Sequence, residues 1–113
     1  MLARANRVVR ADDFRTTVRK GKRVGTPHAV VYLASRMSDE PTRFGFIVAK
    51  TVGNSVTRNL MRRRLRSVGR DLLLRHATGR DIVIRALPGS PEVSWTTLQR
   101  EISDGVDRGV SKR

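Results

Sequence analysis

The sequence predicts an α+β fold of one domain, in which helices pack on a single sheet. Three observations predict it. The chain has 113 residues, enough for one domain with a modest core. Apolar and β-forming patterns follow one another as helix, two or three strands, helix, strand and helix. No repeat or linker divides residues 1–113, and flexible ends are expected at about 1–6 and 108–113.

The first half of the chain is expected to hold one short helix and two or three strands. Asp12 and Asp13 are acids suited to the positive end of a helix, and Gly21 closes it. Gly45 lies inside a run of β-formers, which indicates a bulge or the close approach of another group. Strands are predicted at residues 28–33 and 44–48, with a further edge strand at residues 23–26.

The second half is expected to hold a long helix, a strand and a final helix. Asn54 and Ser55 supply capping side chains for the long helix, which is predicted to extend to about Leu74. A strand follows at residues 81–86, and Ser94 is the expected cap of the final helix. The apolar side of that helix is expected to join the core through Trp95, Leu98, Ile102 and Val106.

Positive charge is the dominant feature of the composition. Lysine and arginine number 24 against 10 acidic residues, for a net charge of +14, and 20 of the 24 are arginine. Arginine presents a planar fork of donors that binds phosphate through two hydrogen bonds, whereas lysine is a point charge. Residues 1–23 and 54–75 each carry +6, while residues 90–113 are neutral. This uneven distribution predicts a shaped surface for a polyanionic partner.

Several classes of protein are excluded by what the sequence lacks. There is no cysteine, so disulfides, thiol nucleophiles and thiolate metal sites are ruled out. No apolar run reaches the length of about 18 residues that spans a membrane, and the first residues do not read as a secretory signal. We therefore expect a cytoplasmic protein with no membrane partner and no metal bound to the chain itself.

The long helix carries the strongest functional signal. At 100° per residue its apolar side chains fall within an arc of about 60°, and a broad arginine and asparagine face spreads over about 140° beside it. Six arginines occur from Arg58 to Arg70, and no acid interrupts them before Asp71. Solvated helix faces usually interleave Glu with Arg or Lys, so this self-repelling face predicts a bound polyanion. The expected apolar residues are Met61, Leu65, Val68 and Leu72.

Residues 58–66, Arg-Asn-Leu-Met-Arg-Arg-Arg-Leu-Arg, resemble the Arg-Asn-x-x-Lys/Arg-Arg-x-x-Arg signature of the bacterial ribonuclease P protein. The strand and Gly-Asn turn at residues 44–56 look like the segment that leads into that family's signature helix. Asn6-Arg7, followed by Asp-Asp-Phe at residues 12–14, matches its opening. The similarity covers about residues 5–106, in order and with matching spacing.

The resemblance implies an αβββαβα sandwich like domain 2 of ribosomal protein S5, with a left-handed βαβ crossover. It also implies a function, in which a monomeric protein binds the ribonuclease P RNA in a 1:1 complex and contacts the 5′ leader of precursor tRNA. The ribonucleoprotein so implied would be an Mg²⁺-dependent endonuclease that removes the leader to give the mature tRNA 5′ end. The RNA subunit would hold Mg²⁺ and carry catalysis, so no catalytic residue is expected on this chain.

The resemblance assigns two groups of binding residues. The signature helix would contact the RNA subunit through Arg58, Asn59, Arg62, Arg63, Arg66 and Arg70. A cleft between the first helix and the sheet would hold the leader at Phe14, Val18, Tyr32 and Lys50. The chain departs from the family pattern at Val18, where Phe is frequent, at Leu60, where a basic residue is common, and at Thr51, where a second Lys is frequent.

Three other functions remain open from the residues alone. A structural RNA-binding protein, such as a small ribosomal protein, would be equally basic but would carry different motifs. A stand-alone nuclease would need an acid and a base converging on one phosphate, and His28 and His76 are far apart in the sequence. A DNA-binding regulator would need a second helix placed as in a helix-turn-helix.

Overall fold

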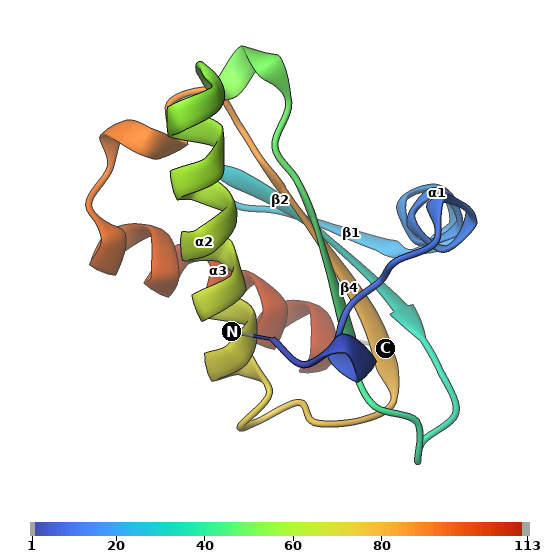
Figure 1. The fold of residues 1–113 in the computed structure, drawn as a ribbon. Helices are drawn as coiled ribbons and strands as arrows, with labels where there is room; N and C mark the ends of the chain where they lie inside the picture. The colour runs from blue at the N-terminus through green and yellow to red at the C-terminus, as the bar shows by residue number, and fades with distance from the viewer. Residues whose placement is uncertain (1, 112–113) are drawn as a thin grey trace.

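The computed structural model describes residues 2–111, which form a four-stranded sheet with helices on both faces (Figure 1). The strands are β1 (Lys22–Gly25), β2 (Ala29–Ser35), β3 (Arg43–Ile47) and β4 (Arg80–Ala86). Their order across the sheet is β1-β2-β4-β3. β2 is antiparallel to β1 and to β4, whereas β3 is parallel to β4.

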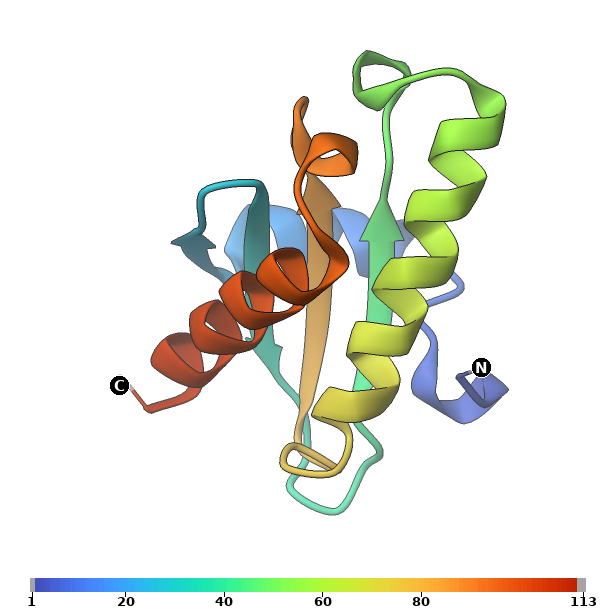
Figure 2. The same cartoon turned by 90° about the vertical axis from the view of Figure 1, so that its left-hand side faces the viewer.

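The helices lie in two layers on either side of this sheet. They are α1 (Ala11–Lys20), α2 (Ser55–Leu72) and α3 (Trp95–Ser111). Figure 2 shows α2 and α3 side by side on one face of the sheet, with α1 behind it. Short 3-10 turns precede α1, α2 and α3 at Arg4–Asn6, Lys50–Val52 and Ser90–Glu92.

The main core fills the space between the sheet and the pair α2 and α3. The four apolar residues predicted for α2 are all fully buried there: Met61, Leu65, Val68 and Leu72. Leu98, Ile102 and Val106 of α3 join them, as predicted. Because successive strand residues point to opposite faces, every second residue of β2 contributes to this core, at Ala29, Val31 and Leu33.

A smaller apolar cluster lies on the other face of the sheet, under α1. Val30, Tyr32 and Val83 form its buried part, and Phe14 and Val18 of α1 pack against them. The two α1 residues are four positions apart and therefore lie on one side of the helix. α1 thus rests on few apolar contacts, whereas α2 and α3 rest on the main core.

These observations confirm the predicted α+β class and the order αβββαβα. The edge strand expected at residues 23–26 is present as β1. α2 connects the parallel strands β3 and β4. The hand of this crossover, which the resemblance implies to be left, stays a prediction. Within residues 2–111, no helix is both long and apolar enough to cross a membrane.

Defined elements are present at both ends, where the sequence predicts flexible residues. Near the N-terminus, Leu2 is buried against the main core and a 3-10 turn follows it. Near the C-terminus, α3 continues through residues 108–111, and Gly109 is buried so closely that a β-carbon there would lie 2.6 Å from Leu33. Residues 1, 112 and 113 lie outside the described residues.

Candidate nucleic-acid interface

α2 begins at the predicted cap. The Asn54 side chain accepts a hydrogen bond from the Thr57 N–H at 2.9 Å, which satisfies one of the unpaired donors at the helix start. Arg58 folds back over this turn and donates to Gly53 O at 3.2 Å and to Ser55 Oγ at 3.3 Å. These contacts fix the start of α2 to the loop that follows β3. The position of the helix start in turn determines where the arginines farther along the helix lie.

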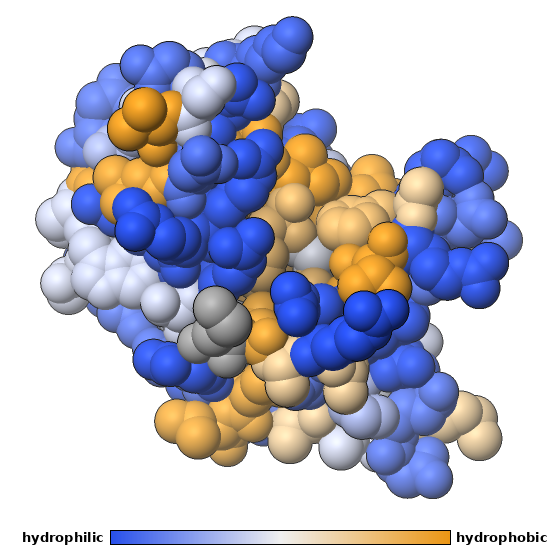
Figure 3. Space-filling view, viewed as in Figure 1, coloured by the Kyte–Doolittle hydropathy of each residue, from blue (hydrophilic) through white to orange (hydrophobic). Residues whose placement is uncertain are grey.

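A groove lies between α1, β3 and α2, and we call it the basic groove. It is lined by Arg7, Val8, Phe14, Phe44, Gly45, Phe46, Arg62 and Arg66. The segment before α1 is held on the edge of β3 because the Val8 N–H donates to Phe44 O at 2.9 Å. The fold therefore joins Arg7, from the first basic block, to Arg62 and Arg66, from the second. Figure 3 shows apolar surface here, between hydrophilic surfaces over α1 and α2.

A second hollow opens against α1, and we call it the α1 hollow. It is lined by Phe14, Arg15, Val18, Arg19 and Ile47, so it is mostly apolar with two arginines. Phe14 lines both the α1 hollow and the basic groove. A nucleotide in a single strand presents an apolar base face and a charged phosphate. The basic groove and the α1 hollow together offer apolar and aromatic side chains for the base and arginines for the phosphate.

The four residues assigned to the leader do not all lie at this surface. Phe14 and Val18 line the α1 hollow. Tyr32 is only 5% exposed and packs in the small cluster under α1, so it supports the surface from below. Lys50 is exposed at the start of the 3-10 turn after β3, and it lines neither the α1 hollow nor the basic groove.

The residues assigned to the RNA subunit are divided between two sides of α2. Arg62 and Arg66, one turn apart, line the basic groove. Asn59 lies beside them, and its Oδ1 accepts a hydrogen bond from Arg62 Nη1 at 2.9 Å. Arg63 instead lines a different hollow, together with Arg64 and the start of α3. The single arginine face expected from the sequence is therefore two arginine surfaces in the structure.

Three arginines to which neither the sequence nor the resemblance assigns a binding role line the basic groove and the α1 hollow. They are Arg7 in the basic groove and Arg15 and Arg19 in the α1 hollow. All three belong to the basic block of residues 1–23, so the charge of that block was the available signal. Conversely Arg70, which the resemblance assigns to the RNA subunit, is exposed on α2 but lines neither the basic groove nor the α1 hollow.

An ion-pair network attaches α1 to the sheet. Arg43 of β3 donates to both carboxylate oxygens of Asp81 in β4, at 2.8 and 2.7 Å, and to Asp13 of α1 at 3.4 Å. The hydrogen bond with Asp81 raises the pKa of Arg43 above its ordinary value, although burial acts in the opposite direction. Asp13 therefore connects α1 to β3 in addition to complementing the helix dipole.

Gly45 makes room for the aromatic ring that both hollows share. A β-carbon at Gly45 would lie 2.5 Å from Cε1 of Phe14, so the close approach predicted at this glycine is that of the Phe14 ring. We expect Gly45→Ala to displace the ring and to lower the free energy of unfolding by about 1–3 kcal/mol, measured by urea unfolding. Gly25→Ala is the control, because a β-carbon there meets nothing within 4 Å. Equal losses at the two positions would contradict this explanation.

Both histidines contact carboxylates of α3. His28 Nδ1 lies 2.8 Å from Glu101 Oε1, and His76 Nε2 lies 2.9 Å from Asp107 Oδ1. Neither histidine lines the basic groove or the α1 hollow. In the part of the chain that the structure describes, no three His, Asp or Glu side chains gather into a potential metal site. The contacts of the histidines thus attach turns of the chain to α3, outside the arginine surfaces.

The Asp107 carboxylate predicts a dependence of stability on pH. Burial alone would raise the pKa of Asp107, but hydrogen bonds from His76 and Arg75 outweigh it and hold the pKa below its ordinary value. A carboxylate of this kind stabilises the fold above its unfolded-state pKa, and the contribution is lost as the pH falls through the folded-state value. We expect Asp107→Asn to lower the urea midpoint at neutral pH, and this difference to vanish in strong acid.

The control for Asp107 is Asp104→Asn, an exposed acid three residues away on α3. This variant is expected to have the wild-type urea midpoint across the same pH range. A difference between Asp107→Asn and the wild type that stays constant down to strong acid would contradict the prediction, because the ionised carboxylate would then not be its cause.

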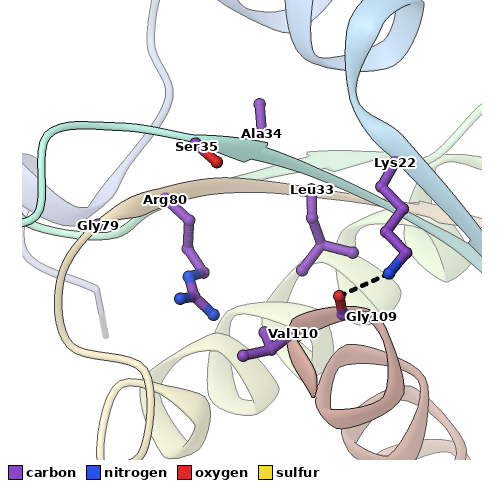
Figure 4. A pocket seen from close by; sticks show the side chains of 8 residues that line it. All are labelled: Lys22, Leu33, Ala34, Ser35, Gly79, Arg80, Gly109 and Val110. Atoms are coloured by element: carbon purple, nitrogen blue, oxygen red, sulfur yellow. Dashed lines mark hydrogen bonds between the residues drawn. The ribbon is translucent and has the colours of Figure 1, made fainter. Parts of the chain in front are cut away.

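A further hollow lies at the C-terminal end of α3, where this helix packs beside β1, β2 and β4 (Figure 4). Lys22 Nζ donates to Gly109 O at 3.1 Å, and Arg80 extends from β4 toward the same turn. Cations at this end of a helix are stabilised by its dipole. These two positive side chains therefore stabilise the C-terminal end of α3 and are not part of the arginine surfaces on α1 and α2.

Relatives of known identity match nearly the whole chain. The family model of ribonuclease P matches residues 2–109. The ribonuclease P protein component of Clavibacter michiganensis is 52% identical over 110 residues, which cover 97% of each chain. That of Pseudarthrobacter chlorophenolicus is 46% identical over 112 residues, which cover 99% of this chain and 82% of the relative.

Two solved structures share the fold. The ribonuclease P protein of Staphylococcus aureus matches with a TM-score of 0.80 and 24% identity, covering 93% of this chain and 95% of that one. The ribonuclease P protein of Thermotoga maritima matches with a TM-score of 0.80 and 24% identity, covering 90% and 96%. The solved structures support the architecture, and the family model and the sequence relatives establish the membership. The chain belongs to the ribonuclease P protein family.

Proposed function

We propose that this chain is the protein component of ribonuclease P, and that it binds the RNA subunit through α2 and the 5′ leader of precursor tRNA along α1. The observation that carries the proposal is the basic groove, where the fold joins the two basic blocks of the sequence across the edge of β3. Membership of the ribonuclease P protein family supports the ribonuclease P RNA as the partner of this groove, and precursor tRNA as the second partner is part of the proposal. A monomeric protein in a 1:1 complex with the RNA subunit is part of the same proposal.

The arginines of α2 suit the phosphate backbone of a folded RNA. Arg62 and Arg66 both face the basic groove, so their guanidinium groups can bind successive phosphates with two hydrogen bonds each. Asn59 restrains the Arg62 side chain, which reduces the entropy lost when a phosphate binds. Each neutralised phosphate also releases condensed counterions, so the affinity is expected to fall steeply with salt.

The α1 hollow suits a single strand, whose bases are free to stack. Phe14 offers an aromatic ring, Val18 an apolar neighbour, and Arg15 and Arg19 positive charges beside them. Stacking on an aromatic side chain contributes about 1–3 kcal/mol per base. Lys50 stays a predicted contact, for a part of the leader that extends past the end of β3.

This proposal gives the chain a binding role in phosphodiester hydrolysis. The RNA subunit would hold the Mg²⁺ that the hydrolysis requires. Contacts with the leader exist only in the precursor, because the mature tRNA has lost that segment. The chain would therefore increase the affinity for substrate relative to product, which promotes substrate capture and product release.

The leader contact is tested in the reconstituted enzyme with Phe14→Ala. We expect this variant to bind precursor tRNA about tenfold more weakly than the wild type does, because one stacking contact is lost. Its affinity for mature tRNA is expected to equal that of the wild type. Val18→Phe is expected to act in the opposite direction, since a second ring would enlarge the stacking surface. The measurement is equilibrium binding of both tRNAs by the enzyme.

Met37→Ala is the control for these variants, because Met37 is an exposed apolar side chain outside both hollows. Melting temperatures measured on the same preparations separate loss of the contact from unfolding. If Phe14→Ala weakens precursor and mature tRNA equally, the leader does not lie on α1 and this part of the proposal is wrong.

A further inference from the structure

A hollow on the α3 side of α2 contains Arg63, which the resemblance assigns to the RNA subunit, together with residues to which the proposed function gives no role. It is lined by Leu60, Arg63, Arg64, Ser67 and Trp95, and we call it the tryptophan hollow. It shares no lining residue with the basic groove, where Arg62 and Arg66 lie. α2 therefore presents positive charge on two separate surfaces.

The two arginines of the tryptophan hollow have no protein partner. Arg62 is hydrogen-bonded to Asn59, but neither Arg63 nor Arg64 forms a hydrogen bond or ion pair with any residue from 2 to 111. Adjacent guanidinium groups repel each other, and an anion bound between them relieves that repulsion. α3 begins at this hollow, so the positive end of its dipole adds to the attraction for an anion.

The rest of the hollow is apolar and aromatic. Trp95, predicted to be a core residue, is only partly buried, and its indole packs against the main core while also lining the hollow. Leu60 lies opposite on α2, and Val56, one turn earlier, is 79% exposed. Apolar side chains exposed beside unpaired arginines are typical of a surface that a partner covers.

We propose that the tryptophan hollow binds an unpaired nucleotide of the RNA subunit, with its base stacked on Trp95 and its phosphates held by Arg63 and Arg64. The inference rests on the proposed function, because the RNA subunit is the partner. Two unpaired cations disfavour an apolar peptide, whereas a flat indole beside guanidinium groups suits a base and its phosphate. α2 would then lie between two segments of RNA, one in each surface.

The fluorescence of Trp95 tests this proposal directly, because it is the only tryptophan in the chain. The full-length protein is titrated with the RNA subunit, and tryptophan emission and RNA binding by filter retention are recorded on the same samples. We expect emission to be quenched in parallel with binding and to reach a plateau at one RNA per protein. Acrylamide, which reaches the half-buried indole of the free protein, is expected to quench the complex much less.

The outcomes of this titration separate the two proposals. If the RNA subunit binds tightly while the emission and its acrylamide quenching stay those of the free protein, no base lies on Trp95; the inference is then overturned and the proposed function stands. If the RNA subunit does not bind at all, the proposed function fails, and this inference fails with it.

Variants of the hollow provide a second test. Trp95→Leu keeps an apolar side chain and removes the ring, so we expect about tenfold weaker RNA binding, with most of the affinity restored in Trp95→Phe. Arg63→Ala with Arg64→Ala is expected to lower the slope of log affinity against log salt by about two. Arg100→Ala, an exposed arginine of α3 outside the hollow, is the control. Wild-type affinity and salt slope in correctly folded hollow variants would overturn the inference.

Discussion

Replacing Arg62 and Arg66 together by alanine is expected to weaken binding of the RNA subunit by at least about 100-fold. Each residue lines the basic groove, and a charge-assisted hydrogen bond lost from each is worth about 1.5–3 kcal/mol. The slope of log affinity against log salt is expected to fall by about two, since two phosphate contacts disappear. Titration of the RNA subunit at several salt concentrations measures both quantities.

Two further variants define the cause of this loss. Arg62→Lys with Arg66→Lys keeps the charge but removes the planar fork, so an intermediate affinity is expected with most of the salt slope retained. Arg108→Ala, an exposed arginine in the last turns of α3, controls for the loss of positive charge elsewhere on the protein. Unchanged affinity and an unchanged slope in the double alanine variant would exclude the basic groove as an RNA-binding surface.

Phe44→Ala is expected to lower the free energy of unfolding by about 3–5 kcal/mol, the usual cost of removing a buried phenyl ring. The ring is 1% exposed and stacks with Phe46, at a centroid distance of 6.3 Å and an interplanar angle of 6°. A β-carbon at Gly69 of α2 would lie 3.3 Å from Cγ of Phe44, so the helix backbone approaches this ring closely. Phe44 is thus the fully buried ring between β3 and the helix that carries the arginines, and the partly buried Phe46 packs beside it.

Urea unfolding checks this expectation, and Phe46→Ala is the matched control. Phe46 is only partly buried, so its loss is expected to cost less than the loss of Phe44. If Phe44→Ala costs no more than Phe46→Ala, the packing of α2 on β3 does not depend on the buried ring.

The elements of this fold could be predicted from the sequence because their signals are local. Asn54 caps α2 as expected, and Ser94 caps α3 by accepting a hydrogen bond from the Thr97 N–H at 3.1 Å. The spacing of Met61 and Leu65 identified the buried side of α2, since a helix repeats every 3.6 residues. Patterns of this kind do not depend on where other parts of the chain lie.

The arrangement of the binding surfaces could not be predicted in the same way. A helical wheel places Arg63 near Arg62 and Arg66, but it does not say that α1 borders one side of α2 and α3 the other. Tyr32 is buried because α1 covers that face of the sheet, and Arg7 reaches the basic groove because its segment pairs with β3. These positions depend on contacts between distant segments, which local periodicity does not describe.

We propose that this chain assists a catalytic RNA and does not itself cleave RNA. Cleavage of precursor tRNA at low Mg²⁺ tests it with the protein alone, the ribonuclease P RNA alone, and both together. We expect cleavage to require both, with release of the intact 5′ leader. Cleavage by the protein alone would contradict the claim and direct attention to His28 and His76. A failure to stimulate a competent RNA would instead indicate a structural RNA-binding protein.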